Sequence, residues 1–443
     1  MKSTLVVAVV SIAVTLIVWG VVGRSEGNRD IERFHRPVAL NLLAGNGYSI
    51  TEDNGTLSPM GDLTPGYPLL LAGTYAVGGV FGLSEEAAMA LLSLVSGAAA
   101  SVLIYLLARF LWGEIGIIAG LAWATYPVAV SLMLQSYTES PFIVVLYAAV
   151  LLLWHTARQR PRAVSRYFIA GMLFGAATLI RPFSFGAVGA AAVGLLWLAQ
   201  DLPRRSRIAW ALLLIAGQVV IMLPWQIWAS GTFNKIIILD NQRGGRDLRY
   251  GLTFNVLDER ETLLSEDAAD EAYDAMRAAQ DSVSRDADSA ITDYISVIIN
   301  RFTEDFVGTT LYYLDRFAQG WYGTSSGNLQ NLIAVIQIIY APVLLAGIVA
   351  ARRQWRFVLS VLLIFAYYTA VILVTFPMVR YLLPSIGLLF VFIPALIPAR
   401  ISRRIVSMLG TNPTSSTTPI TTQPTANLTN SSQPVVDQSG ETP

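Results

Sequence analysis

The sequence of 443 residues contains no cysteine, only two histidines and few charged residues. Without cysteine the chain can form no disulfide, thiolate metal site, iron–sulfur cluster or cysteine nucleophile. His35 and His155 leave little material for a metal site built from histidine. Charged residues make up 14% of the chain, against about 25% in a typical soluble protein. This is too little polar surface for a soluble globular protein.

Apolar residues make up 54% of the sequence and occur in blocks long enough to cross a bilayer. A spanning helix needs about 20 such residues, because the hydrocarbon core is about 30 Å thick and each residue adds about 1.5 Å. On that scale we predict an all-α polytopic membrane protein, a bundle of about ten transmembrane helices. The spans lie near residues 4–22, 87–110, 115–133, 142–156, 167–180, 183–199, 208–229, 329–350, 357–376 and 381–398.

The positive charges predict how these spans are oriented, because short loops rich in Lys and Arg stay cytoplasmic. With ten spans, Lys2 and the arginine clusters at 109, 158–166, 204–207, 352–356 and 400–404 all fall on one side. We therefore expect a multi-pass protein of the plasma or inner membrane with both termini in the cytoplasm. Pro68–Gly82 is apolar but short, and counting it as a span would reverse every later cluster. We expect it to form a juxtamembrane or re-entrant helix.

This arrangement divides the chain into four parts. Residues 1–229 form an N-terminal transmembrane module that includes a first external loop, residues 24–86. Residues 230–328 form an external acidic segment, with an exposed helix over Asp258–Asp293 and an apolar pattern from Ile291 to Phe317 that favours contact with the membrane surface. Residues 329–399 hold the C-terminal transmembrane helices. Residues 400–443, rich in Ser, Thr and Pro, are expected to be a disordered cytoplasmic tail.

Two carboxylates lie close to the predicted external edge of the bilayer. Asp30 follows the first span, on a stretch that reads as an amphipathic helix, and it is either a solvated interfacial acid or a functional one. Glu139 lies between two spans, in Gln-Ser-Tyr-Thr-Glu-Ser-Pro. A carboxylate there is costly unless it is paired, hydrated or bound to a cation, which favours a functional role. The alternative is a helix N-terminus, with Thr138 as the cap and Glu139 in the first turn.

Two arginines lie on the side that positive charge normally avoids. Arg181 precedes Pro182 in the turn between the fifth and sixth spans, and Arg380 precedes Tyr381 at the start of the last span. Each is either a snorkelling side chain or part of a phosphate clamp, since guanidinium groups match phosphate oxygens in pairs. Two carboxylates and two arginines at one interface suggest a site for an anionic lipid headgroup, with room for a divalent metal.

The same residues carry a resemblance to a known family. The sequence is similar to GT-C glycosyltransferases of the branch related to protein mannosyltransferases and aminoarabinose transferases. The similarity covers roughly residues 1–400 in the expected order, although each motif alone is weak. The matching positions are Asp30 and Phe34; Ala39, Leu42, Gly45, Gly47 and Tyr48; Thr64–Pro68; Tyr126-Pro127; Thr138-Glu139; Leu179–Pro182; Gly231–Phe233; Gly244, Gly245 and Leu248; and Val379–Pro384.

The resemblance implies an enzyme, a hexosyl- or pentosyltransferase that takes a sugar from a polyprenyl-phosphate donor on the outer face of the membrane. Asp30 matches the catalytic acidic position, and its task would be to accept the proton of an acceptor hydroxyl during one inverting displacement. Arg181, Arg380 and Tyr381 would bind the donor phosphate. Glu139 matches a second acidic position near the carrier phosphate or an ion. The loop would be shaped by Pro65, Gly66, Tyr67 and Pro68.

The same resemblance bears on cofactors and partners. No cofactor is required, but a divalent cation, Mg²⁺ or Mn²⁺, would find ligands in Asp30 and Glu139. The expected partners are the lipid-linked sugar donor, an envelope glycan, lipid or protein acceptor, and the bilayer. With 30 basic and 30 acidic residues the chain has no overall positive charge, so nucleic acid is not expected.

Departures from the family leave the acceptor open. Aminoarabinose transferases have Glu-Lys-Pro-Pro where this chain has Pro-Gly-Tyr-Pro, and protein mannosyltransferases have a tandem Asp-Glu where this chain has Asp30-Ile31-Glu32. The Trp-Trp-Asp signature of oligosaccharyltransferases is absent too. Two other functions stay open: a transporter or flippase of lipid-linked sugars, and a non-catalytic envelope assembly protein. The transporter is disfavoured because the sequence has no internal repeat and its unusual polar residues lie at one surface.

Overall fold

The computed structural model describes residues 2–23, 31–135, 138–159, 164–252, 266–280, 282–283, 287–324 and 329–408. Within these ranges the regular structure is helical, apart from an antiparallel hairpin in which β1 (Ser49–Thr51) pairs with β2 (Leu57–Pro59). Asp30, residues 253–265 and the tail from residue 409 lie outside the described residues.

Each of the ten expected spans falls on apolar helix. Six helical stretches of the described chain are long and apolar enough to cross a membrane, and two of them, Glu85–Ala124 and Gln330–Val374, each hold more than one helix. Shorter apolar helices occupy Val164–Ile180 and Pro182–Leu198. The helices are α1 (Lys2–Val22), α4 (Glu85–Trp112), α5 (Ile117–Ala124), α6 (Pro127–Leu134), α7 (Glu139–Gln159), α8 (Val164–Ile180), α9 (Ala187–Leu198), α10 (Arg204–Phe233), α15 (Gln330–Ala350), α16 (Trp355–Val374) and α17 (Val379–Leu389).

The third expected span is interrupted between α5 and α6. Pro127 is the first residue of α6, and a proline disfavours helical geometry in the residue before it. Tyr126 accordingly has an extended backbone, with φ −70° and ψ 115°. Its hydroxyl donates a hydrogen bond to Gln337 of α15, at 2.9 Å, so the break is held inside the bundle.

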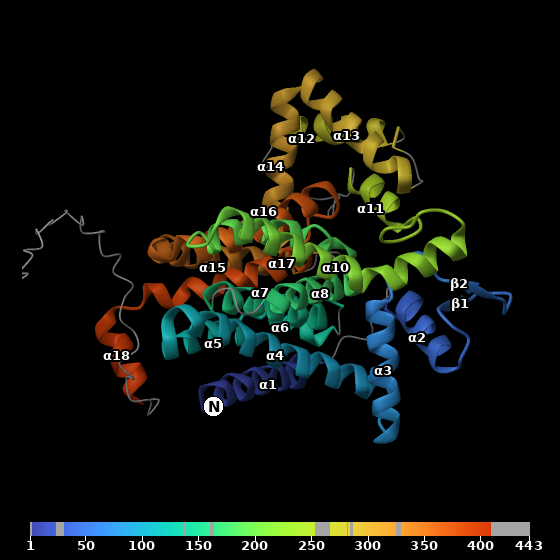
Figure 1. The fold of residues 1–443 in the computed structure, drawn as a ribbon. Helices are drawn as coiled ribbons and strands as arrows, with labels where there is room; N and C mark the ends of the chain where they lie inside the picture. The colour runs from blue at the N-terminus through green and yellow to red at the C-terminus, as the bar shows by residue number, and fades with distance from the viewer. Residues whose placement is uncertain are drawn as a thin grey trace, which may run out of the picture.

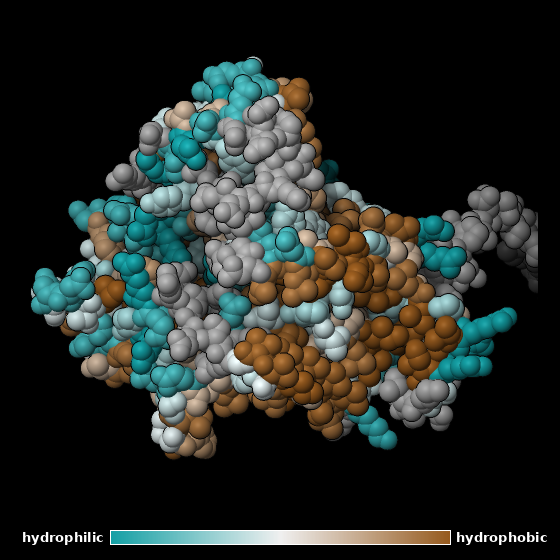
Figure 2. Space-filling view, turned by 180° about the vertical axis from the view of Figure 1, so that it is seen from behind, coloured by the Kyte–Doolittle hydropathy of each residue, from teal (hydrophilic) through white to brown (hydrophobic). Residues whose placement is uncertain are grey.

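The bundle has two chemically different ends. Figure 1 shows α4 and α10 running along a common direction, with the hairpin at one end and α18 (Ala399–Met408) near the other. Figure 2 shows an apolar surface over the bundle between hydrophilic ends. Arginines of the expected cytoplasmic clusters lie at the α18 end, where Arg158 donates to the carbonyl oxygen of Phe110 (3.1 Å) and Arg356 pairs with Asp201 (3.3 Å). The predicted fold class, an all-α polytopic membrane protein, is confirmed.

The loop between the first two expected spans, which we call the first loop, forms the opposite end of the bundle, which we call the site end. A short π-helix (Ile31–His35) leads into α2 (Arg36–Leu43), and α3 (Gly66–Val80) follows the hairpin. Figure 1 shows α3 lying crosswise to α4 and α10. Such a placement is that of a juxtamembrane helix and not of a span, as expected for Pro68–Gly82.

The segment between α10 and α15 contains α11 (Arg243–Gly251), α12 (Glu266–Gln280), α13 (Ala287–Glu304) and α14 (Phe306–Tyr322). The single acidic helix expected over Asp258–Asp293 is therefore divided, since α12 ends at Gln280 and α13 begins at Ala287. Exposed apolar residues follow one another along α13 and α14, in keeping with the expected contact with a membrane surface. They are Ile291, Ile295, Ile299, Phe306 and Val307.

The segment is attached to the bundle through a fully buried arginine. Arg316 of α14 is 0% exposed and donates hydrogen bonds to the carbonyl oxygens of Leu373 (2.9 Å) and Thr375 (2.7 Å). These carbonyls lie at the C-terminal end of α16, where the helix itself leaves oxygen atoms without partners. Arg316 thus provides hydrogen-bond donors for the carbonyl groups at the end of α16 and attaches α14 to that helix.

Helix also extends further along the chain than expected. The tail was predicted to be disordered from residue 400, but α18 occupies Ala399–Met408. Its sequence, Ala-Arg-Ile-Ser-Arg-Arg-Ile-Val-Ser-Met, places apolar residues four apart among arginines, which is helical spacing. The rest of the tail lies outside the described residues.

Helices α8 and α10 pack closely because glycines face each other across their interface. A Cβ atom placed on Gly171 of α8 would collide with the carbonyl group of Leu214, and one on Gly217 of α10 would lie 2.8 Å from the amide nitrogen of Met172. Gly171 and Gly175 are four residues apart, the spacing that lets membrane helices approach each other closely. The sequence analysis did not identify this interface.

We expect Gly217→Ala to separate α8 from α10 and to destabilise the fold by about 1–3 kcal/mol, the usual cost of overpacking a tight interface. Thermal unfolding in detergent measures the effect. Gly189→Ala is the matched control, because a Cβ at Gly189 of α9 would meet no atom within 4 Å. Equal unfolding temperatures for the two variants would contradict this account of the interface.

Candidate functional site

Three helix ends meet at the site end of the bundle and bring together residues that are far apart in the sequence. α7 begins at Glu139, α8 ends at Ile180 just before Arg181, and α17 begins at Val379 just before Arg380. Pro182 starts a short 3₁₀ helix (Pro182–Ser184) and leaves Arg181 extended, with φ −139° and ψ 105°. The ends of apolar helices thus carry the charged side chains that the sequence analysis singled out.

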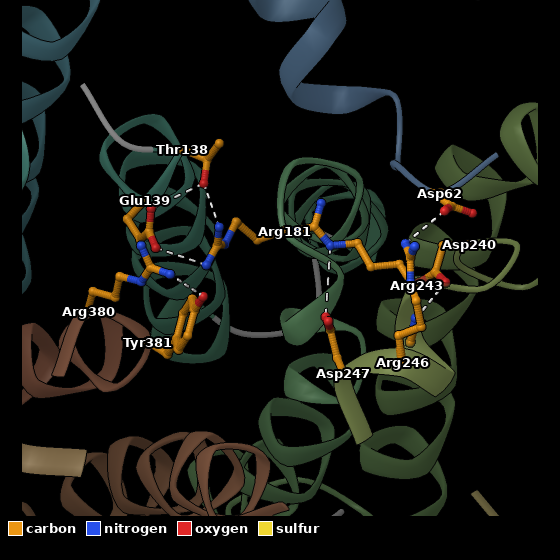
Figure 3. Close-up of polar contacts among 11 residues, drawn as sticks. Asp62, Thr138, Glu139, Arg181, Asp240, Arg243, Arg246, Asp247, Arg380 and Tyr381 are labelled. Atoms are coloured by element: carbon orange, nitrogen blue, oxygen red, sulfur yellow. Dashed lines mark hydrogen bonds and ion pairs between the residues drawn. The ribbon is translucent and has the colours of Figure 1, made fainter. Parts of the chain in front are cut away.

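Glu139 and Arg181 form an ion pair with little access to solvent. The Nη2 atom of Arg181 lies 2.9 Å from Oε1 of Glu139, and its Nη1 donates to the hydroxyl of Thr138 at 2.6 Å. The Thr138 hydroxyl in turn donates to Oε2 of Glu139 at 3.1 Å. The Glu139 side chain is 2% exposed and that of Arg181 is 18% exposed. Figure 3 shows the three side chains pointing toward one another.

Arg380 and Tyr381 complete this cluster. The Nη2 atom of Arg380 donates to the Tyr381 hydroxyl at 2.6 Å. The Tyr381 ring also faces both guanidinium groups, that of Arg380 at 4.7 Å and that of Arg181 at 5.1 Å from its centroid. Together with Glu139 these side chains line a small pocket whose other walls are Phe142, Phe183, Tyr368 and Pro384. Two arginines and one carboxylate give the lining a net positive charge, which suits an anion.

The motif Pro65-Gly66-Tyr67-Pro68 lies directly beside this pocket. Gly66 packs so closely on the end of α8 that an added Cβ would lie 2.5 Å from the carbonyl carbon of Leu179. Tyr67 and Pro68 are buried in the first turn of α3. Glycine is therefore needed at position 66 for the loop to approach the chain just before Arg181.

A second polar cluster, which the sequence analysis missed, joins the first loop to α11. Arg246 forms an ion pair with Asp62 at 2.8 Å, and the amide of Asn241 donates to the carbonyl oxygen of Gly61 at 2.9 Å. Asp240 accepts a hydrogen bond from the amide of Gly244, also in α11, at 2.7 Å. The pair of Arg246 and Asp62 joins parts of the chain that are 184 residues apart. The sequence signal was the run Arg-Gly-Gly-Arg-Asp at 243–247.

Two ionisable side chains of this region, those of His35 and Asp247, have shifted pKa values. Burial, with the nearby Arg243 and Arg181, lowers the pKa of His35 to about 3, so the imidazole is neutral at physiological pH. Burial raises the pKa of Asp247 to about 6. The positive charge of Arg243 acts on both groups and lowers the pKa of each. Neither His35 nor Asp247 was a candidate from the sequence, where each reads as an ordinary loop residue.

The cation site expected at Asp30 and Glu139 stays a prediction. Asp30 lies outside the described residues, and no group of three or more His, Asp or Glu side chains gathers among those that are described. Both oxygens of Glu139 already accept hydrogen bonds, from Arg181 and Thr138. Arg181 is the positively charged partner of Glu139 among the described residues.

A larger cavity lies at the opposite end of the bundle. It has a volume of about 480 Å³ and is lined by Leu106, Arg109, Phe110, Leu151, His155 and Arg158. No carboxylate lines it, and its arginines belong to the clusters expected in the cytoplasm. The smaller pocket is the better candidate site, because it gathers Glu139, Arg181, Arg380 and Tyr381.

Comparisons with known proteins identify the fold. Residues 62–228, less than half of the chain, match the sequence model of the family described as dolichyl-phosphate-mannose-protein mannosyltransferase. No curated protein matches the chain. The oligosaccharyltransferase of Archaeoglobus fulgidus, in a complex with zinc and sulfate, superposes with a TM-score of 0.54 at 14% identity over 92% of this chain and 50% of that one.

A second structure of this archaeal enzyme, AglB with an inhibitory peptide and a dolichol-phosphate, gives a TM-score of 0.52 at 14% identity, over 93% of this chain and 52% of that one. The chain has the GT-C fold. It spans about half the length of the archaeal oligosaccharyltransferases that it matches. ArnT from Cupriavidus metallidurans, bound to undecaprenyl phosphate, matches with a TM-score of 0.45 at 16% identity, over 88% of this chain and 76% of that one.

In this GT-C chain we expect Glu139→Gln to lower the stability by about 2–3 kcal/mol, because the charge of Arg181 then stays largely buried without its partner. Removing both charges, in Glu139→Gln with Arg181→Met, should restore most of the loss. Thermal unfolding of the two single variants and the double variant measures the coupling. Additive losses in the double variant would contradict the ion pair as the reason.

Proposed function

We propose that the chain is a membrane glycosyltransferase that moves a hexose or pentose from a polyprenyl-phosphate donor to an envelope acceptor, on the extracytoplasmic side of the plasma or inner membrane. The observation that carries the proposal is the pocket formed by Arg181, Arg380, Tyr381 and Glu139 where apolar helices of a GT-C fold end. A headgroup placed there keeps its hydrocarbon tail in the bilayer. The positive lining suits a phosphate.

The comparisons support the same donor class. The matched family takes its name from transfer out of dolichyl-phosphate-mannose, and the archaeal neighbour AglB has been solved with a dolichol-phosphate. The polar residues of the site lie at one end of the bundle, whereas a transporter gathers its polar residues near the bilayer midplane. This placement favours an enzyme over a flippase.

In the proposed reaction an acceptor hydroxyl attacks the anomeric carbon of the sugar from the side opposite the phosphate. The new carbon–oxygen bond forms while the bond from that carbon to the phosphate oxygen breaks, and the configuration inverts. Asp30 accepts the proton of the hydroxyl as general base. Polyprenyl phosphate leaves with one more negative charge, which Arg181 and Arg380 stabilise. Glu139 holds Arg181 in place.

We expect Asp30→Asn to lower the turnover number by about 100-fold or more, since an amide cannot accept the proton. Transfer of radiolabelled sugar from polyprenyl-phosphate donors in membranes measures the rate, and binding of polyprenyl phosphate should stay unchanged. Asp53→Asn is the matched control, because Asp53 is an exposed carboxylate of the same loop. Normal turnover in Asp30→Asn would remove Asp30 from the mechanism.

Arg380→Ala should weaken the binding of polyprenyl phosphate by roughly 10- to 100-fold, the value of one charge-assisted hydrogen bond. Arg380→Lys keeps the charge but loses the paired donors, so its affinity should lie in between. Titration of the purified protein in detergent gives the dissociation constants. Arg356→Ala, at the opposite end of the bundle, controls for general loss of positive charge. An unchanged affinity in Arg380→Ala would place the phosphate elsewhere.

A further inference from the structure

Beside the pocket lies a histidine that has a buried hydrogen-bonding atom and no partner for it. The His35 side chain is 8% exposed, and its Nδ1 atom forms no hydrogen bond with any described residue. Its ring contacts Tyr67 edge-on, with 4.9 Å between the ring centroids. Leaving such an atom without a hydrogen bond costs free energy, so each case needs an explanation. A ligand group that forms a hydrogen bond with Nδ1 would explain it.

The fold brings His35 close to Arg181 through a short chain of contacts. His35 contacts Tyr67, and Tyr67 follows Gly66, which packs on Leu179 two residues before Arg181. His35 therefore lies near the end of α8, close enough to Arg181 for that charge to contribute to lowering its pKa.

Arg243 and Asp247 face the same region from α11. Figure 3 shows the Arg243 side chain extending from α11 in the direction of Arg181, with Asp247 beside it. The Nε atom of Arg243 lies 3.9 Å from Oδ2 of Asp247. This distance is too long for a hydrogen bond. The pair attract each other, yet the guanidinium at Nε can still donate, and the carboxylate at Oδ2 can still accept, toward a third group.

The combination of charges limits what this third group is. A guanidinium, a carboxylate and a neutral imidazole have no net charge when Asp247 is ionised. A second phosphate would be repelled by Asp247, and a cation would be repelled by Arg243 and Arg181. A neutral ligand with several hydroxyl groups fits all three side chains, because each hydroxyl both donates and accepts hydrogen bonds.

We infer that His35, Arg243 and Asp247 form a subsite that binds hydroxyl groups of the donor sugar, next to the phosphate pocket of Arg181 and Arg380. The inference rests on the proposed function, because a sugar linked to a phosphate in that pocket must lie within a bond or two of it. The three residues touch the sugar and not the carrier, so they determine which sugar is accepted.

Binding of two lipids that differ only in the sugar tests the subsite. The probes are polyprenyl phosphate alone and the same lipid carrying mannose or a pentose, titrated into the purified full-length chain in detergent. The wild type should bind a sugar-bearing lipid more tightly than the bare lipid. His35→Phe, which keeps a ring against Tyr67, and Asp247→Asn should each lose roughly tenfold in affinity for the sugar-bearing lipid. Both should bind bare polyprenyl phosphate as the wild type does.

Arg380→Ala is the matched control from the neighbouring pocket, because it should weaken the binding of both lipids by the same factor. Thermal unfolding of every variant, measured alongside, separates loss of the subsite from loss of the fold. If His35→Phe and Asp247→Asn weaken both lipids equally, or neither, the subsite is wrong. A wild type that binds the bare lipid and the sugar-bearing lipids alike also overturns it. A wild type that binds neither lipid overturns the proposed function itself.

Discussion

The guanidinium group of Arg181 is the charge around which the site end is built. It donates to Thr138 and Glu139 at the start of α7 and faces the ring of Tyr381 in α17. A cation with so little solvent around it needs a fixed counter-charge, and Glu139 supplies it. Because α7, α8 and α17 are separate helices, one ion pair sets how their ends lie relative to one another. The first loop then packs against the same point through Gly66.

The fold was largely predictable because membrane insertion depends on a local property. A run of about 20 apolar residues has few alternatives to a helix in hydrocarbon, and the spans were found where the sequence placed them. What the sequence did not show was how they are interrupted. Pro127 was visible, but the same apolar run suits a continuous or a broken span. Only contacts such as that of Tyr126 with Gln337 decide between them.

The residues of the candidate site also fall into two groups, those that the sequence indicated and those that it did not. Glu139, Arg181 and Arg380 could be found because charge at the end of an apolar span is unusual and therefore informative. His35, Arg243 and Asp247 lie in polar segments of the sequence, where charged residues are common. Their surroundings form through contacts between distant segments: Arg246, next to Asp247, forms an ion pair with Asp62 of the first loop. Pairing over such a distance leaves no periodic pattern in the sequence, so it could not have been predicted. Asp30 is still known from the sequence alone.

The close backbone contact at the glycines of α8 and α10 fixes the position of Arg181 along the bundle. Gly171 cannot slide past Leu214 and Gly217, because backbone meets backbone there and no side chain can yield. Arg181 follows Gly171 by ten residues, about 15 Å along a helix axis at 1.5 Å per residue. The depth of the guanidinium relative to the bundle is thus fixed by a contact well away from it. In this protein, spacing within one helix sets the level at which a charge meets the membrane boundary.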